Sequence, residues 1–387
     1  MNKNRINLFF PKIVFYILYF GVLFFAAIPS AIAPYSISDI ILISLSTLSL
    51  FNLNKIGTLY IFCAIIWFIV SSFLGEIRGV ETSAVTGLSL GLKWAGAFNI
   101  YIFLVSKADS KWPIFKTLTI LQMLVLVSLL TNTRPFPGNF YSGTNGVFQA
   151  SADGGYYLIC SLGLFLNLYK IYASRLILFN ILISLVSLIL VDSRVGSILG
   201  ALVLIYYLLS SNKTRPIILF LSIILYVCFY FQLISIPTKI DLLISRLNDP
   251  IQLIENDLSM LIRINNFANA FDMTSIASYF LGNGAKFYKL GGNYFFEQNN
   301  SLDNSYLYLF LSFGIPGLIL FYLVFLSDYG FNIKKRGIFC FLCLAFPLMQ
   351  DTFSNSFSLL GLSIFLAIDT IFKNFKQQTT LTNFKYN

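Results

Sequence analysis

The side chains best suited to chemistry in this chain are an aspartate and two arginines beside long apolar segments. Asp303 stands next to Asn304 and Tyr306 at the start of an apolar run. Arg194 lies in "VDSRVGS", a short polar break between two apolar runs, and Arg263 lies in the long segment 237–303, within an otherwise apolar stretch of helical spacing. A carboxylate partly shielded from water can accept the proton of a hydroxyl group. A guanidinium suits bidentate binding of phosphate oxygens.

Each of these residues also has a purely structural explanation. Asp and Asn are both favoured at helix starts, so Asp303 also fits a helix cap. Arg194 beside Asp192 fits a charge that ends a membrane segment, and Arg263 fits the polar face of an amphipathic helix. A positive charge on the outer side of a membrane opposes the usual charge distribution, however, so Arg194 needs a further reason.

Two further basic residues are candidates for binding substrate. Lys93 lies well inside the apolar segment 84–105. Its ammonium can reach the membrane surface, pair with an acid of a neighbouring helix or hold a lipid phosphate, and the pairing is favoured. Arg246 lies in the longest polar stretch, where an ordinary solvated charge is the alternative.

The residue types that are missing exclude several kinds of site. The chain contains no His, which excludes imidazole bases and His-ligated metals. Its 5 Cys lie in apolar segments, where thiols behave as small hydrophobic groups. Cys340 and Cys343 form a C-x-x-C with no second pair nearby, a weak signal for a metal site. We therefore expect neither a metal nor another cofactor, and chemistry by carboxylates, Arg, Lys, Tyr or amides.

The elements that must position these residues are membrane helices. The 387-residue chain is 57% hydrophobic and only 11% charged, which is typical of a polytopic membrane protein. Apolar runs of about twenty residues, enough to cross about 30 Å of hydrocarbon, recur along it. The net charge of +10 therefore indicates topology, and no nucleic-acid partner is expected.

We expect an all-α fold with about twelve transmembrane helices in a single integral membrane domain, residues 1–387. The predicted spans are 12–29, 36–51, 56–74, 84–105, 114–131, 154–173, 176–192, 196–210, 215–236, 304–327, 337–350 and 356–373. With a cytoplasmic N-terminus, most of the 26 basic residues fall in short inside segments. Both termini are therefore expected in the cytoplasm, and the arginine and aspartate candidates on the outer face.

One outer segment, residues 237–303, is far longer than the others. A loop of that length in a compact membrane protein is usually functional. Apolar residues at helical spacing predict short helices on the membrane face, with Asp249-Pro250 as a start and the Gly282-Asn283-Gly284 run as a stop. In the following span, Gly314, Pro316 and Gly317 predict a bend that is tolerable only where neighbours satisfy the freed backbone groups.

Four stretches form an ordered set of motifs. "VDSRVGSILGALVLIYYLL" has a Ser-Arg-small run that opens a span, and "IRINNFANAFDMTSIASYFLGNGAKF" has an Arg, an aromatic residue, a helix and Leu-Gly-x-Gly. "DNSYLYLFLSFGIPGLILFYLVF" has Asp-Asn-x-Tyr-Leu and then Gly-Ile-x-Gly-Leu, while "YSGTNGVFQASADGGYYLICSLGLFL" carries a weaker likeness. Together, over about residues 140–330, they resemble the superfamily of Wzy O-antigen polymerases and O-antigen ligases.

The resemblance implies a GT-C-like glycosyltransferase that needs no metal and works at the periplasmic face of the bacterial inner membrane. Its donor and acceptor would be undecaprenyl-pyrophosphate-linked glycans. Arg194 and Arg263 match the two arginines thought to bind the lipid pyrophosphate, and Asp303 stands where ligases have a His that activates the acceptor. Asn304 and Tyr306 would position sugar hydroxyls. A chain-length regulator and a flippase are implied as protein partners, beside the lipid bilayer.

Because this chain has no His, the resemblance favours the polymerase branch. The alternatives are an O-antigen ligase that transfers polymer to lipid A-core, a polysaccharide or lipid transporter, and a non-catalytic assembly subunit. Transporters commonly have repeated halves. No matching broken segments are evident in residues 1–190 and 196–373, and the single large outer loop is asymmetric.

Overall fold

The computed structural model describes eleven parts of the chain, and every regular element within them is a helix. The described residues are 37–46, 56–80, 82–107, 114–131, 148, 151–191, 193–210, 275–285, 304–325, 337–348 and 356–384. The helices are α2 (Ile37–Ser46), α3 (Ile56–Ile77), α4 (Ala84–Lys107), α5 (Ile114–Leu130), α6 (Ser151–Tyr172), α7 (Arg175–Leu190), α8 (Arg194–Ser210), α13 (Ile276–Leu281), α15 (Ser305–Leu323), α17 (Ile338–Ala345), η4 (Phe346–Leu348) and α18 (Ser356–Phe384).

These helices follow the predicted spans. Each predicted span within the described ranges contains a helix, whereas spans 12–29 and 215–236 lie outside the described residues. Among the described residues, three helical segments are long and apolar enough to cross a membrane, namely Leu59–Ile77, Ala84–Ser106 and Ser305–Leu323. The all-helical fold and these apolar segments support a membrane protein. The number of crossings and the location of both termini stay predictions.

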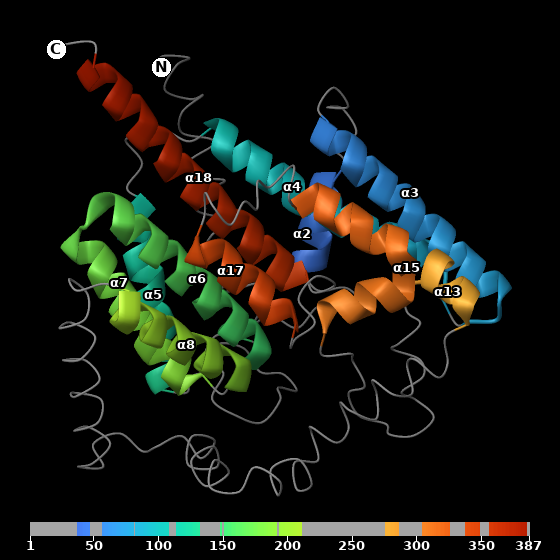
Figure 1. The fold of residues 1–387 in the computed structure, drawn as a ribbon, viewed down its shortest axis with the longest axis horizontal. Helices are drawn as coiled ribbons and strands as arrows, with labels where there is room; N and C mark the ends of the chain where they lie inside the picture. The colour runs from blue at the N-terminus through green and yellow to red at the C-terminus, as the bar shows by residue number, and fades with distance from the viewer. Residues whose placement is uncertain are drawn as a thin grey trace, which may run out of the picture.

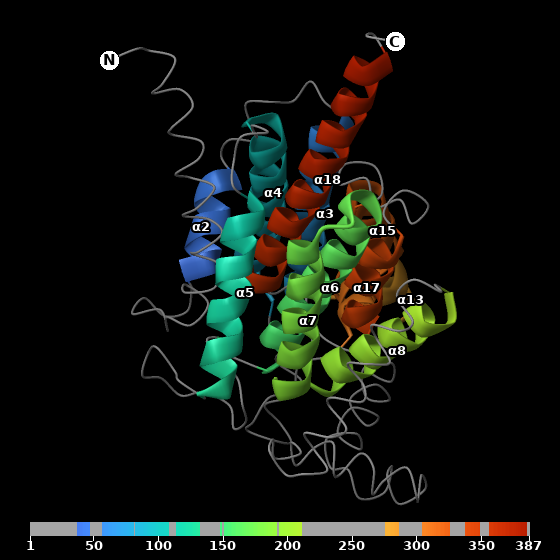
Figure 2. The ribbon, with the colours of Figure 1, turned by 90° about the vertical axis from the view of Figure 1, so that its left-hand side faces the viewer.

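The long helix α18 joins two groups of helices. It packs against α2 and α4 on one side, where α3 and α15 follow, and against α6 on the other, where α5, α7 and α8 follow (Figure 1). Its 29 residues correspond to about 43 Å of helix, more than the ~30 Å of membrane hydrocarbon. Figure 2 shows its C-terminal end projecting from the end of the bundle opposite α8.

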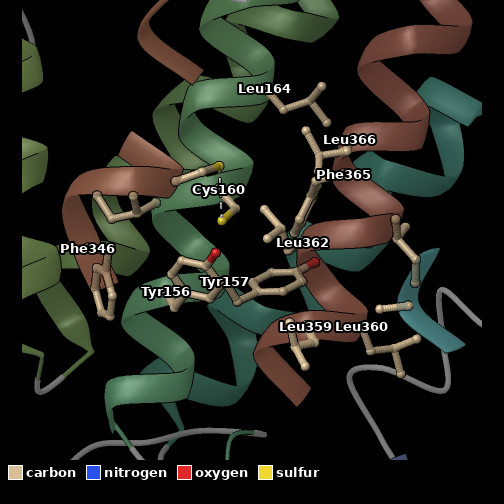
Figure 3. Packing of buried hydrophobic residues seen from close by; sticks show 14 of the residues in the cluster. Tyr156, Tyr157, Cys160, Leu164, Phe346, Leu359, Leu360, Leu362, Phe365 and Leu366 are labelled. Atoms are coloured by element: carbon tan, nitrogen blue, oxygen red, sulfur yellow. Dashed lines mark hydrogen bonds between the residues drawn. The ribbon is translucent and has the colours of Figure 1, made fainter. Parts of the chain in front are cut away.

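The interface between α6 and α18 is a close-packed apolar core. Tyr156, Tyr157 and Cys160 of α6 are buried in it. Phe346 of η4 packs against Tyr156 on one side, and the leucines and Phe365 of α18 lie on the other (Figure 3). The thiols of Cys160 and Cys343 lie 3.6 Å apart in this core. Cys160, Cys340 and Cys343 are buried and free of disulfide bonds, in keeping with the small apolar role expected of them.

Ionised side chains within the bundle are paired. The ammonium of Lys93 in α4 lies 2.5 Å from Oδ1 of Asp39 in α2, so the expected pairing with an acid of a neighbouring helix is observed. The fully buried carboxylate of Asp369 in α18 accepts hydrogen bonds from Asn167 Nδ2 at 2.6 Å and from Lys373 Nζ at 2.8 Å. Charges shielded from water are costly unless they are paired. The Lys93–Asp39 pair joins α4 to α2, and the bond from Asn167 to Asp369 joins α6 to α18.

We expect Lys93→Met to destabilise the protein by about 3 kcal/mol, because it removes the ammonium from a carboxylate that is largely shielded from water. Thermal unfolding of the full chain in detergent measures this loss. The double variant Lys93→Met with Asp39→Asn should recover part of it, since both charges are then absent. A loss in the double variant equal to the sum of the losses in Lys93→Met and Asp39→Asn would show that the two residues do not stabilise one another.

Candidate functional site at the bend of α15

Helix α15 is broken at Gly314 instead of continuing straight. Gly314 has φ 66° and ψ −168°, a conformation that glycine adopts far more readily than other residues. Pro316 follows within the same turn and lacks a backbone N–H. Figure 1 shows the two halves of α15 meeting at a sharp bend beside α13. Neither half alone is long enough to cross the ~30 Å of hydrocarbon. We call residues 305–313 the outer half of α15, after the side of the membrane predicted for them.

A short stretch of the long loop fills the inside of the bend. We call residues 282–285 the wedge segment, and all of it is buried. The backbone N–H of Asn283 donates to Leu311 O at 3.1 Å, and that of Gly284 donates to Ser312 O at 2.7 Å. The side-chain amide of Asn283 also reaches Leu311 O, at 3.2 Å. The wedge segment therefore satisfies carbonyls that the break in α15 would otherwise leave without donors.

Helix α3 supplies the other donors. The indole N–H of Trp67 donates to Phe313 O at 2.7 Å, and the hydroxyl of Ser71 donates to Ser312 O at 2.9 Å. One residue further along, the hydroxyl oxygen of Ser72 accepts the N–H of Ala285 at 3.1 Å. The expectation that neighbours would satisfy the freed backbone groups of this span is confirmed.

Glycines allow the wedge segment to approach so closely. Gly282 ends α13 with φ 74°, and its N–H donates to Ser278 O at 2.8 Å, so the predicted stop at this glycine run is confirmed. Gly284 has φ 96° and leaves room for Thr82. A Cβ atom at Gly75 of α3 would lie 2.9 Å from Asn283 C. The predicted start at Asp249-Pro250 lies outside the described residues.

Arg78, the residue directly after α3, is hydrogen-bonded to the first residue of the wedge segment. Its Nε donates to Leu74 O at 3.0 Å and its Nη1 to Ser278 Oγ at 3.3 Å, while Nη2 donates to Gly282 O. One guanidinium thus connects the end of α3, helix α13 and the first residue of the wedge segment.

The outer half of α15 begins with a side-chain cap. Asn304 Oδ1 accepts the N–H of Leu307 at 2.9 Å, so the capping role considered for Asp303 belongs to Asn304. Asp303 itself lies outside the described residues. The hydroxyl of Tyr306 donates to Leu344 O at 2.8 Å, which attaches the outer half of α15 to α17. Both polar groups expected at a sugar therefore also serve the fold.

The N-terminal ends of α6 and α8 meet beside the same region. Helix α8 begins at Arg194, and Ser193 before it accepts the N–H of Gly196 at 3.2 Å. A Cβ atom at Gly196 would lie only 3.2 Å from the Cα of Gly155 in α6, so the two helices cross closely. Beyond the first residue of α8, nothing is described of the Arg194 side chain.

The short helix η4 lies next to α6, α8 and α15. The ring of its first residue, Phe346, lies 5.2 Å from that of Tyr156 in α6, and η4 contacts both α8 and α15. The helices that carry Arg194 and Tyr306 therefore share η4 as a neighbour. Lys93 lies elsewhere, in its pair with Asp39. Arg246 and Arg263 lie outside the described residues, and within the described ranges no group of three His, Cys, Asp or Glu could hold a metal ion.

Residues 179–322 match the Wzy_C family, described as O-antigen ligase. The O-antigen ligase match runs from α7 through α8 and α13 into the inner half of α15. It supports the O-antigen ligase and polymerase superfamily, whose members are glycosyltransferase-like membrane enzymes, and does not separate a ligase from a polymerase. It contains Arg194, Arg263 and Asp303 as well as the wedge segment. No curated protein matches the chain.

The O-antigen ligase match leaves out α3, whose residues hold the bend. Trp67, Ser71 and Arg78 precede residue 179 and were not singled out as candidates from the sequence. A signal existed for Arg78, because it is a positive charge expected on the outer side of the membrane, where such charges need a specific reason. Trp67 and Ser71 carry no comparable signal, since Trp and Ser are ordinary residues of an apolar helix.

We expect Gly282→Ala to be far more damaging than Gly79→Ala. Both glycines have positive φ angles, 74° and 80°, and the ψ of 173° at Gly282 belongs to a region open essentially to glycine alone, where alanine costs about 1–3 kcal/mol. A Cβ atom at Gly282 would also lie 2.5 Å from Phe313 Cα, whereas at Gly79 nothing lies within 4 Å. The overlap adds about 1–3 kcal/mol. Thermal unfolding of the two variants in detergent measures the difference, and equal stabilities would contradict tight packing of the wedge segment.

Proposed function

We propose that this chain is a membrane glycosyltransferase that joins lipid-linked oligosaccharide repeat units into a surface polysaccharide such as O-antigen. The observation that carries the proposal is the O-antigen ligase match over residues 179–322, which contains Arg194, Arg263 and Asp303. The donor and the acceptor are undecaprenyl-pyrophosphate-linked glycans. The reaction takes place at the periplasmic face of the bacterial inner membrane, and both termini lie in the cytoplasm.

The proposed step is an inverting transfer. A hydroxyl oxygen of the acceptor attacks the anomeric carbon of the donor, and the bond from that carbon to the pyrophosphate oxygen breaks as the new glycosidic bond forms. Asp303 takes the hydroxyl proton. Arg194 and Arg263 stabilise the negative charge on the departing undecaprenyl pyrophosphate, which two guanidiniums can do without a divalent ion.

The way in which α15 is held supports the acceptor side of this proposal. A general base works only within hydrogen-bond distance of its hydroxyl, so it needs a rigid carrier. The outer half of α15 is attached to α17 by Tyr306 and to the wedge segment by Tyr308, whose hydroxyl donates to Ala285 O. Because Asn304 Oδ1 already accepts the N–H of Leu307, Asn304 binds a sugar through its side-chain NH₂ group, as a hydrogen-bond donor. The hydroxyl of Tyr306 binds a sugar as a hydrogen-bond acceptor, because its own proton is donated to Leu344 O.

The two remaining basic candidates, Arg246 and Lys93, have different roles in the proposal. Arg246 stays a candidate for substrate binding in the long loop, residues 237–303, which would cover an extended sugar chain in the periplasm. Lys93 is engaged with Asp39 within the bundle, and we assign it to the fold. A chain-length regulator and a flippase are the expected protein partners of such a polymerase.

The ligase is the second candidate, and the description of the matched family favours it. A ligase would transfer a finished polymer from undecaprenyl pyrophosphate to lipid A-core. The chain contains no His, and Asp303 stands where the resemblance places the ligase His. A carboxylate can still accept a proton from a sugar hydroxyl, so the difference in residue type favours the polymerase without changing the class of reaction.

Deletion of the gene separates these functions in the host. The polymerase predicts lipopolysaccharide with a single repeat unit on its core and no ladder on a gel, because flipping and ligation continue. Bare core with long lipid-linked polymer would identify a ligase. Bare core with no periplasmic polymer would identify a transporter and contradict the proposal.

Arg194→Ala should lower polymerisation by about 10²–10³-fold in a host that expresses the variant normally, because a donor to the leaving group is lost. Arg194→Lys should retain part of the activity, since an ammonium keeps the charge but loses the bidentate fork. Arg175→Ala is the matched control, because Arg175 also begins a helix, α7, but lies outside the proposed site. Ladder intensity on a gel is the measurement.

The same measurement on Arg263→Ala and Asp303→Ala tests the rest of the assignment. We expect both variants to lose the ladder at a normal amount of protein. Full polymerisation in all three alanine variants would contradict the proposed site.

A further inference from the structure

We propose that Arg78 is a positioning residue of this enzyme. Its guanidinium fixes the wedge segment, residues 282–285, against the end of α3, and through that segment it sets the direction of the outer half of α15. Only the expected effect on polymerisation rests on the proposed function. The effect on the structure does not depend on it.

The guanidinium of Arg78 is aimed by its own helix. Its Nε donates to Leu74 O at 3.0 Å, one turn back in α3, which holds the planar fork in one orientation. The two terminal nitrogens then reach different elements, Ser278 Oγ of α13 at 3.3 Å and the carbonyl of Gly282. Three donors in a fixed plane suit this task, and the single ammonium of a lysine could not reproduce them.

Arg78 reaches the bend through very few bonds. Gly282, which it holds by the carbonyl, is followed by Asn283 and Gly284, whose N–H groups donate to Leu311 O and Ser312 O at 3.1 and 2.7 Å. These carbonyls lie directly before the break at Gly314. A displacement of Gly282 must therefore shift the donors on which the bend depends.

The outer half of α15 follows the wedge segment for a second reason. The hydroxyl of Tyr308, in that half, donates to the carbonyl of Ala285 at the far end of the segment. The outer half is thus attached to the wedge segment both before and at the bend. It also carries the helix start at Asn304, next to the proposed base Asp303. Arg78 acts on the acceptor side through these contacts and touches no substrate itself.

The end of α3 is shaped for this contact. A Cβ atom at Gly75 would lie 2.9 Å from the carbonyl carbon of Asn283 and 2.8 Å from Thr82 Cγ2, so only glycine leaves the wedge segment its place. Arg78 itself is exposed. An exposed arginine usually contributes little to stability by its charge alone. Arg78 acts here by fixing positions, because its side chain joins α3, α13 and the wedge segment.

Hydrogen exchange of the full chain in detergent tests the structural part. In Arg78→Ala, amide exchange should be about ten-fold faster over residues 282–285 and 305–313, because donors that hold Gly282 are lost. Exchange in α5 and α7 should be unchanged. Arg78→Lys should restore part of the protection, and Arg175→Ala, at the start of α7, should behave as wild type. Should the alanine variant not fold, the lysine variant carries the same test with a smaller increase.

Steady-state polymerisation of purified lipid-linked repeat units tests the consequence for catalysis. We expect Arg78→Ala to lower kcat about ten-fold with little change in KM for the donor, because the proposed pyrophosphate-binding arginines are untouched. Unchanged exchange, or faster exchange with an unchanged kcat, would overturn the inference. If the wild-type chain makes no polymer, the proposed function fails. The exchange data then decide the inference, since faster exchange in the two segments supports it and wild-type exchange overturns it.

Discussion

A backbone carbonyl inside a membrane protein needs a donor from the protein itself, and α15 presents three such carbonyls at one point. Leu311, Ser312 and Phe313 precede the break at Gly314, where the regular bonds of the helix end. Each unsatisfied group would cost several kcal/mol in hydrocarbon. The donors come from the wedge segment and from α3, so both stabilise the bend that Gly314 and Pro316 introduce. The arrangement of this side of the molecule follows from that requirement.

The same bonds join parts of the chain that are distant in sequence. Trp67 and Phe313 are 246 positions apart, and Ser71 and Ser312 are 241 apart. Together with the bonds of the wedge segment, they hold residues 282–285 of the long loop in a buried position between α3 and α15. A loop anchored in this way keeps a fixed position relative to the helices, and so do the groups that it carries over a substrate. A loop attached only at the membrane surface would be free to move.

Apolar length predicted the helices well, because the cost of an exposed peptide group in hydrocarbon forces a helix wherever a span exists. The bend was also predictable, since Gly314 and Pro316 act on their own backbone. Hydropathy reports membrane depth and not helix ends, so α18 continues to Phe384, beyond the predicted end at residue 373. The choice of Asn304 as cap and the bond from Tyr306 to Leu344 depend on distant packing, which local patterns do not contain.

The residues proposed for chemistry belong to different elements, and this imposes a mechanical condition. Arg194 begins α8, whereas Asp303 directly precedes the cap of α15. A base and a leaving-group donor act on one anomeric carbon only if these two helix ends keep a constant separation, since a misplacement of about 1 Å can cost about 10²-fold in rate. The short helix η4 contributes to that constancy, because it contacts α8 and α15 and its Phe346 ring packs on Tyr156 of α6. A rigid connection between the ends of α8 and α15 therefore matters as much to the proposed transfer as the charges themselves.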